Sequence, residues 1–446
     1  MRPIREIVGR KLFKDTLALQ AQTFAGILIS LLTSIALTRI LGKDEYGTYV
    51  LVFAVFNFLN IGRFISPGIV VINRIAEANA AKKPDEIKDA IAYYLKVSVL
   101  TGGIVAVIGV VFGPAVAKLI YGKEVASLAV RLIFLTGFLS IISDLTSTVF
   151  QALRMMFHLA AFNAGQLLLR LGLIVAFMCF GYGVAGVVAG YLISTFIGST
   201  AGILILQKLR KSGIECIPTV PEMIAATLRI PLMKHIGFVS LTSLNKQATT
   251  LIGVVPVLLL GRYAEESEAG FFNLGLHIVS ALWSVFLGLG GNLLPYMSEI
   301  KSRNNESLLK DRFKKVALYS GLASIVIAGI FALVARYAVL IVYGEDYLPV
   351  VPVIYIMLPQ YVLCSFGIAA NSYYIVTKRL LFALLSKAFL LIVSIPFGIW
   401  LVKKHGAFGA GIHYSALLSL VMAVYIADIL YRMKKRPDGN FKQSAL

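Results

Sequence analysis

Charged residues are scarce in this chain, and carboxylates are the scarcest of them. Asp, Glu, Lys and Arg make up 14% of the 446 residues, whereas 58% are hydrophobic. Soluble proteins carry roughly a quarter charged residues, so the composition excludes an ordinary soluble domain. Only 22 Asp and Glu stand against 42 Lys and Arg, and this excess of cations bears on the ligand that the chain can bind.

Residues that hold metals and cofactors are also few. The three cysteines are odd in number and far apart, which argues against a disulfide framework and a cysteine metal cluster; they are Cys179, Cys216 and Cys364. The five histidines show no ligand spacing, and no Walker-type phosphate loop or large segment outside the apolar stretches is present. We therefore expect no metal, no cofactor and no direct use of ATP.

Long apolar stretches dominate what is present. Twelve of them can cross the hydrocarbon of a bilayer, which is about 30 Å thick. They are continuously apolar and lack the alternation of barrel strands, so each predicts a helix. The predicted spans lie near residues 17–38, 47–72, 91–116, 126–151, 160–180, 184–207, 236–260, 270–296, 316–342, 350–376, 380–402 and 407–431. The expected fold is an all-α polytopic membrane protein.

Landmarks of the first half recur in the second half, in the same order and at a nearly constant offset. The matched pairs are Arg39 with Arg262, Gly47 with Gly270, Tyr121 with Tyr343, and Gly183 with Gly406. An even number of spans per copy leaves both copies in the same orientation, a recurrent design of transporters with a site between the halves. The repeat predicts the following parts: an N-terminal six-helix lobe, residues 1–207; a cytoplasmic connector, 208–233; a C-terminal six-helix lobe, 234–431; and a basic cytoplasmic tail, 432–446.

The distribution of basic residues predicts the topology. Most of the 42 Lys and Arg fall in segments that lie on one side of the membrane if the twelve spans alternate. This is the positive-inside bias, and it places both termini and the connector in the cytoplasm. The net charge of +20 is explained in this way, and we expect no binding of nucleic acid.

Polar residues inside spans are costly and usually face a cavity or a partner. Asp144 is the one clear internal carboxylate, and it lies on a polar face of the fourth predicted span. Arg63 and Lys246 have no acidic residue at their depth, so we expect them to bind a ligand. Further polar residues expected to line the same space are Gln22, Asn57, Asn60, Gln166 and His277.

Asp144 and Arg170 are equally far along the chain from an expected turn near residue 157, which predicts an ion pair between them. Such a pair could couple transport to an ion, could be a structural clasp, or could leave Arg170 to contact ligand. Lys387 lies near the cytoplasmic end of its span, and we expect its ammonium to reach the cytoplasmic surface.

The charge balance favours an anionic ligand. Intramembrane cations outnumber carboxylates, which suits a phosphate or diphosphate, and arginine can bind such groups with two hydrogen bonds. Hydroxyls and amides near these cations suit a polyhydroxylated ligand. A sugar joined to a phosphate satisfies both requirements.

The segment Ala36-Leu37-Thr38-Arg39-Ile40-Leu41-Gly42-Lys43-Asp44-Glu45-Tyr46-Gly47-Thr48-Tyr49 resembles the first turn of Wzx-type polysaccharide flippases. These belong to the multidrug/oligosaccharidyl-lipid/polysaccharide (MOP) superfamily, and the resemblance covers essentially the whole chain. It implies a MATE-like, V-shaped transporter in the cell membrane and no enzymatic activity. The implied ligand is an undecaprenyl- or dolichyl-diphosphate-linked oligosaccharide, moved from the cytoplasmic to the outer leaflet by alternating access, for cell-surface polysaccharide synthesis. Implied partners are the lipid bilayer and a glycan polymerase or other biosynthetic membrane proteins.

Three alternatives stay open. A multidrug or metabolite antiporter of the same superfamily is disfavoured by the cationic interior. A membrane-embedded glycan polymerase or ligase is disfavoured because the outer turns are too short for a catalytic loop. A scaffold that has lost transport is disfavoured by the charged residues in mid-membrane.

Overall fold

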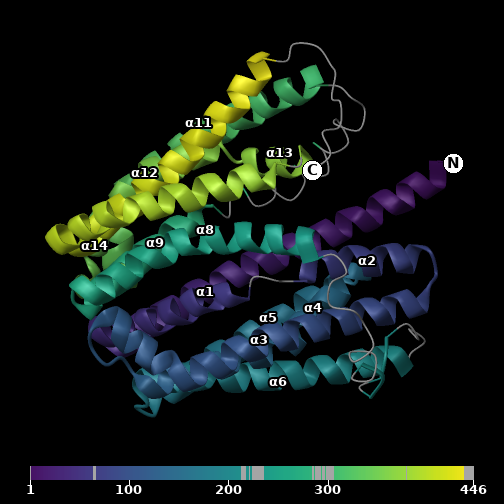
Figure 1. Cartoon of the computed structure of the whole chain (residues 1–446), viewed down its shortest axis with the longest axis horizontal. Coiled ribbons are helices and arrows are strands. Elements are labelled where there is room, and N and C mark those ends of the chain that lie inside the picture. The colour runs from purple at the N-terminus through teal and green to yellow at the C-terminus, as the bar shows by residue number, and fades with distance from the viewer. Residues whose placement is uncertain are drawn as a thin grey trace. The chain divides into compact units, whose positions relative to one another are not determined.

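The structure is a computed structural model, and it describes residues 2–63, 67–211, 217–219, 221–223, 236–283, 286, 293, 297, 306–377 and 379–435. These residues form helices joined by turns, and the described ranges contain no strand (Figure 1). The α-helices are α1 (Arg2–Leu59), α2 (Gly68–Ala80), α3 (Pro84–Tyr121), α4 (Ser127–Ala152), α5 (Met156–Cys179), α6 (Gly183–Lys211), α8 (Ile236–Tyr263), α9 (Glu266–Leu282), α11 (Glu306–Val342), α12 (Val350–Phe366), α13 (Ala370–Val376) and α14 (Leu380–Lys435). Two short 3₁₀ helices are η1 (Asn60–Gly62) and η2 (Glu345–Tyr347).

The helices confirm the predicted all-α membrane fold. Within the described ranges, 8 helices are long and apolar enough to cross a membrane. Two of them each hold two predicted spans. In α1 the backbone leaves the helical conformation at Gly42, and in α14 it does so at Gly406, so each long helix divides close to the predicted turn.

Two predicted spans are broken, which sequence periodicity did not show. The span expected over residues 47–72 ends as a helix at Leu59 and resumes in α2 only at Gly68. Pro67 immediately precedes α2, and a proline has no N–H with which to continue the helical bonding. The span expected over 350–376 is interrupted at Gly367, between α12 and α13.

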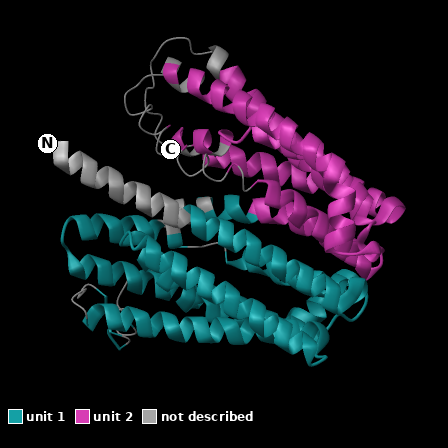
Figure 2. Ribbon diagram, turned by 180° about the vertical axis from the view of Figure 1, so that it is seen from behind, with its two compact units in different colours: residues 1–247 teal, residues 248–446 magenta. Residues whose placement is uncertain are grey.

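The chain divides into two compact units, residues 1–247 and 248–446 (Figure 2). The division falls inside α8, so the first turns of that helix belong to the first unit. Most of the predicted connector 208–233, with Cys216, lies outside the described residues, as does the tail beyond Lys435.

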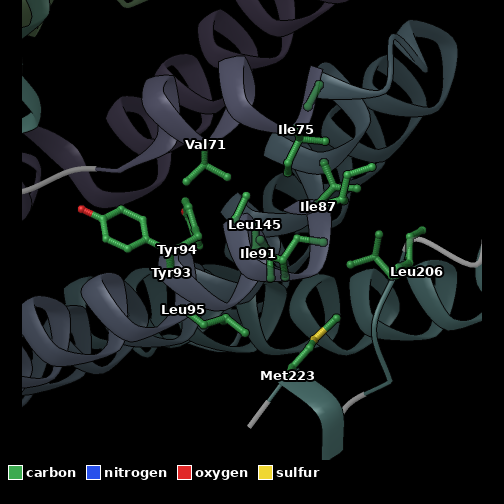
Figure 3. Close-up of a cluster of buried hydrophobic side chains, with 14 of the residues drawn as sticks. Val71, Ile75, Ile87, Ile91, Tyr93, Tyr94, Leu95, Leu145, Leu206 and Met223 are labelled. Carbon is green, nitrogen blue, oxygen red and sulfur yellow. The ribbon is translucent and has the colours of Figure 1, made fainter. Parts of the chain in front are cut away.

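In the first unit, α4 packs against both α3 and α6, and α5 packs against α6 and α1. Glycines allow these helices to approach closely: a side chain at Gly109 would collide with the ring of Phe134. Where α2, α3 and α4 meet, apolar side chains form a buried core (Figure 3). Its members include Val71, Ile75, Ile91, Tyr93, Tyr94 and Leu145.

In the second unit, α12 packs against α9, α11 and α14. Its core surrounds Tyr374, whose ring lies 4.9 Å from that of Tyr425 between centroids. The Tyr374 hydroxyl donates to Asp428, which also binds Arg432 at 2.7 Å. Aromatic and ionic contacts therefore join α13 to the last turns of α14.

The repeat is visible in backbone conformation. Gly183 and Gly406 both have φ of +52°, and Gly122 and Gly344 both have positive φ. Each member of a pair occupies the matching turn of its unit.

A carboxylate contact is repeated as well. In the second unit Glu268 Oε2 accepts a hydrogen bond of 2.5 Å from the backbone N–H of Ala407, where the second half of α14 begins. In the first unit the carboxylate of Glu45, which the repeat aligns with Glu268, lies beside Gly183 at the start of α6. Carboxylates are favoured at helix N-termini because they accept the free N–H groups and oppose the helix dipole. We call these two contacts the turn clamps.

Candidate functional site: a cation cluster in the first unit

Arg63 is placed where the second span breaks. Its N–H donates to the carbonyl of Asn60 at 2.9 Å and closes the single turn of η1. Its guanidinium lies against α3 at Gly102, where a Cβ would come within 3.7 Å of the Arg63 Cζ atom. The Arg63 guanidinium therefore packs on the surface of α3 at this glycine.

Asp144 is the exposed residue on a buried stretch of α4. Its neighbours Ser143 and Leu145 are buried, whereas the Asp144 side chain is open. Ser140, one turn earlier, donates to its carboxylate at 3.3 Å. Among the cations that act on this carboxylate Arg63 is the strongest, followed by Lys246 and Arg170. We call Arg63, Asp144 and Lys246, together with Tyr94 described next, the cation cluster. All four residues belong to the first unit, which builds the cluster from its six helices and the start of α8.

Tyr94 is a member of the cluster that sequence reasoning missed. Its hydroxyl interacts with the side chains of Ser98 and Thr148 and with the charges of Asp144 and Arg63. In the sequence Tyr94 reads as one more apolar residue of a long span. The spacing of apolar and polar residues along the chain does not reveal that a tyrosine hydroxyl contacts polar groups on a second helix.

The start of α8 is hydrogen-bonded to the break that follows α1. Gln247 donates through Nε2 to the carbonyl of Asn60 at 3.3 Å. The adjacent residue, Lys246, is exposed although its helix is apolar. This contact brings the turn of α8 that carries Lys246 beside the break at Asn60.

The ion pair expected between Asp144 and Arg170 does not form: the ion pairs of the described residues do not include it. The turn between α4 and α5 comes at residues 153–155, earlier than expected. Asp144 therefore lies about two helical turns before the end of α4 at Ala152, whereas Arg170 lies about four turns after the start of α5 at Met156. The two side chains are thus offset by about 9 Å along the helices, which is too far for direct contact.

Arg170 instead lies on an aromatic surface. Its Cζ is 4.8 Å from the ring centroid of Tyr191 on α6, and the Tyr191 hydroxyl is 3.3 Å from that of Tyr49 on α1. Phe53 packs against both tyrosine rings, at 4.6 and 5.1 Å between centroids. We call Arg170, Tyr191, Tyr49 and Phe53 the Arg170 cradle.

The other predicted site residues are distributed more widely. Gln166 packs against Gly198 of α6, and Asn60 donates to the Phe56 carbonyl at the end of α1. Asn57 is half-buried, and Gln22 has a buried Oε1 without a hydrogen-bond partner among the described residues. These four lie in the first unit, whereas His277 is exposed on α9 of the second unit. Their roles in binding stay predictions.

Lys387 does not reach the surface as expected. Its side chain is buried, and its Nζ donates to Thr249 Oγ1 of α8 at 2.8 Å and lies 5.9 Å from the Tyr425 ring centroid. Both partners belong to the second unit. The Thr249 hydroxyl and the face of the Tyr425 ring stabilise the Lys387 ammonium in its buried position.

The cation cluster is not repeated in the second unit. The residues that the repeat aligns with Asn60, Arg63, Asp144 and Arg170 are Trp283, Phe286, Gly367 and Val393. Trp283 and Phe286 pack on the ring of Tyr361, at 5.4 and 6.2 Å between centroids. The two units therefore share a fold but differ in chemistry at equivalent positions.

Other kinds of site are not found in the part of the chain that the structure describes. No group of three or more His, Cys, Asp or Glu side chains there could hold a metal ion. A groove of ≈ 570 Å³ runs between α11 and α12, and its lining is almost entirely apolar. Such a groove suits hydrocarbon and provides no charge for a polar ligand.

A family model for polysaccharide biosynthesis proteins matches residues 12–301, well over half of the chain. The chain belongs to this family. No curated protein matches the chain. Its membership agrees with the resemblance drawn from the first turn, and the match includes every residue of the cation cluster.

Solved structures show the same fold. An inward-facing multidrug resistance MATE family transporter of the MOP superfamily has a TM-score of 0.73 and 15% identity, covering 93% of this chain and 96% of that one. The eukaryotic MATE transporter AtDTX14 gives 0.69 and 16%, covering 96% and 97%. A MOP superfamily transporter from Pyrococcus furiosus, described as having a binding pocket of reverse polarity that suggests a different function, gives 0.60 and 16%, covering 94% and 96%. This polysaccharide biosynthesis family member thus has the fold of MOP-type transporters.

Proposed function

We propose that the protein is a flippase that moves a polyprenyl-diphosphate-linked oligosaccharide from the cytoplasmic to the outer leaflet. The proposal places it in the cell membrane with both termini in the cytoplasm, working beside enzymes of cell-surface polysaccharide synthesis. Membership of a polysaccharide biosynthesis family and the fold of a MOP-type transporter support it. The observation that carries it is the cation cluster of the first unit.

The cluster is positively charged as a whole. Arg63 and Lys246, the two cations that act most strongly on Asp144, outnumber its single carboxylate. Charges inside a membrane need partners, and a diphosphate diester would balance the excess. An organic cation would be repelled, which argues against a multidrug substrate. The reversed pocket polarity described for the Pyrococcus transporter supports the view that pocket charge separates functions within this fold.

The cluster would lower the desolvation cost of the charged headgroup, which is the main energetic obstacle to lipid flipping. Taking an unshielded charged headgroup into hydrocarbon costs on the order of tens of kcal/mol, while the polyprenyl tail can stay in the bilayer. Guanidinium and ammonium groups replace the lost water by charge-assisted hydrogen bonds. Rocking of two lobes around the bound headgroup would then expose it to the other side.

The test replaces Arg63 or Lys246 by Gln in purified protein in liposomes. Each change removes one charge-assisted contact, worth about 1.5–3 kcal/mol, so we expect flipping of a short polyprenyl-diphosphate disaccharide to fall roughly 10- to 100-fold. Arg131→Gln is the matched control, because Arg131 is an exposed cation at the other end of α4, and it should retain wild-type activity.

Two results would contradict the proposal. One is normal flipping by both variants at wild-type abundance. The other is wild-type protein that exports cationic drugs and leaves the diphosphate lipid in place, which would indicate the multidrug alternative.

A further inference from the structure

The Arg170 cradle holds a cation whose hydrogen-bonding capacity is not fully used in the described part of the chain. Arg170 Nε is buried and has no hydrogen-bond partner there. The guanidinium lies instead against the face of the Tyr191 ring. Guanidinium carries five N–H donors, and leaving a buried donor without a partner is unfavourable.

The geometry determines which part of the guanidinium is available. The Tyr191 ring covers one face of the group, and a guanidinium that lies on a ring can still donate hydrogen bonds in its own plane. The in-plane donors of arginine form a fork that fits the two oxygens of a carboxylate or phosphate. Beside this fork, the Tyr49 and Tyr191 hydroxyls form a pair that can bond to neutral oxygens. Arg170, Tyr49, Tyr191 and Phe53 are all half-buried, so part of each side chain lies at the surface of the first unit.

The separation from Asp144 argues for a distinct part of the ligand. Measured from the turn between α4 and α5, Arg170 lies deeper than Asp144, by about 9 Å along the helices. Arg63, the cation that acts most strongly on Asp144, belongs to the level of Asp144. One diphosphate group does not bridge the two levels, but the first sugars of a glycan attached to it do.

We propose that the Arg170 cradle is a second oxyanion subsite, which binds an acidic group, a carboxylate or phosphate, on the glycan of the transported lipid. This inference rests on the proposed flippase function and deepens it. A neutral sugar would leave the arginine charge without a counter-charge, whereas an acidic sugar supplies it. The tyrosine hydroxyls beside it bind the hydroxyls of the same ring. The protein therefore prefers an acidic glycan.

The experiment compares two probes in liposomes. Both are short polyprenyl-diphosphate disaccharides, and they differ only in the second sugar, a hexose in one and a hexuronic acid in the other. We expect wild-type protein to flip the acidic probe at a several-fold lower half-saturating concentration. Arg170→Gln should remove this preference by raising the half-saturating concentration of the acidic probe about tenfold, with the hexose probe changed less than twofold. Arg170→Lys keeps the charge but loses the fork, and it should retain part of the preference.

The outcomes are separable. Arg131→Gln should leave both probes unchanged, and membrane abundance and thermal unfolding of each variant identify any folding defect. An equal loss of both probes in Arg170→Gln would overturn the inference, because the oxyanion would then be the diphosphate itself. Unchanged transport of both probes would overturn it too. A wild-type protein that moves neither probe would instead contradict the proposed function.

Discussion

At the scale of single residues, the buried Lys387 and the half-buried Arg170 are stabilised by different contacts. Lys387 has a hydroxyl partner and an aromatic neighbour within its own unit. Arg170 has an aromatic neighbour, but among the described residues its buried Nε has no hydrogen-bond partner. A cation that is satisfied within the fold serves stability, and one with free donors is available to a ligand. The two residues should therefore respond differently to mutation.

Replacing Thr249 by Val keeps the shape of the side chain and removes the oxygen that accepts from Lys387. We expect a destabilisation of about 1–3 kcal/mol, because a buried charged group loses a hydrogen bond. Thermal unfolding of the detergent-solubilised protein measures it. Thr200→Val is the matched control, since the Thr200 hydroxyl is exposed and donates to the Phe196 carbonyl of its own helix. An unchanged midpoint for Thr249→Val would show that the contact contributes nothing to stability.

The residue types of the cluster could be predicted from the sequence, but their pairing could not. Charges in apolar spans are conspicuous, so the sequence alone identifies Arg63, Asp144 and Lys246. The partner of Asp144 depends on where α4 ends, and a shift of a few residues in that turn moves Arg170 out of reach. Tyr94 could not be predicted as a site residue, because aromatic residues are common in apolar spans.

At the scale of elements, glycines with positive φ form the turns that the repeat shares. Gly183 and Gly406 have φ of +52°, and Gly406 combines it with ψ of −130°, a region that residues with a side chain rarely adopt. The matching glutamates lie directly against these glycines. Backbone conformation and the turn clamp therefore depend on the same position.

Gly183→Ala and Gly406→Ala should each be destabilising by about 1–2 kcal/mol, because the backbone strain of a side chain at positive φ adds to the displacement of the glutamate. Gly172→Ala is the control: Gly172 lies inside α5, a Cβ there would contact nothing within 4 Å, and alanine is favoured over glycine in a helix by about 0.5–1 kcal/mol. The midpoints of thermal unfolding of the three variants test the repeat. If the two glycines are equivalent, both Gly183→Ala and Gly406→Ala lower the midpoint.

At the scale of the whole molecule, the sequence predicted the class of fold and the repeat because both rest on long, redundant patterns. Each span contributes about twenty apolar residues, so single exceptions do not hide it. The breaks after Leu59 and after Phe366 were missed for the opposite reason. The break after Phe366 contains only apolar residues, Gly367 to Ala369, so hydropathy does not show it. The break after Leu59 contains Arg63 and Pro67, but the apolar residues on both sides of it keep the mean hydropathy of the span high.

The expected topology can be tested with single cysteines in a background without Cys179, Cys216 and Cys364. A membrane-impermeant maleimide should label cysteine at Lys123, in the turn between α3 and α4, or at Glu266, the first residue of α9, in intact cells. Cysteine at Lys83, between α2 and α3, should react only after permeabilisation, because basic segments stay in the cytoplasm. A position expected inside, Arg303, lies outside the described residues and provides a further site. The reverse labelling pattern would contradict the orientation.

The turn clamps also bear on how the chain is made. Glu268 and its partner Ala407 are 139 positions apart in the sequence, and the repeat gives Glu45 and the start of α6 a similar separation. The first turn of each unit therefore meets its partner only after the last long helix of that unit has begun. At a synthesis rate of roughly 5–20 residues per second, this delay is on the order of ten seconds. Nascent chains with cysteines at Glu45 and Gly183 should therefore cross-link only once they extend past α6. Each half would leave the ribosome as an open chain of helices and close late, the first half before the second is complete.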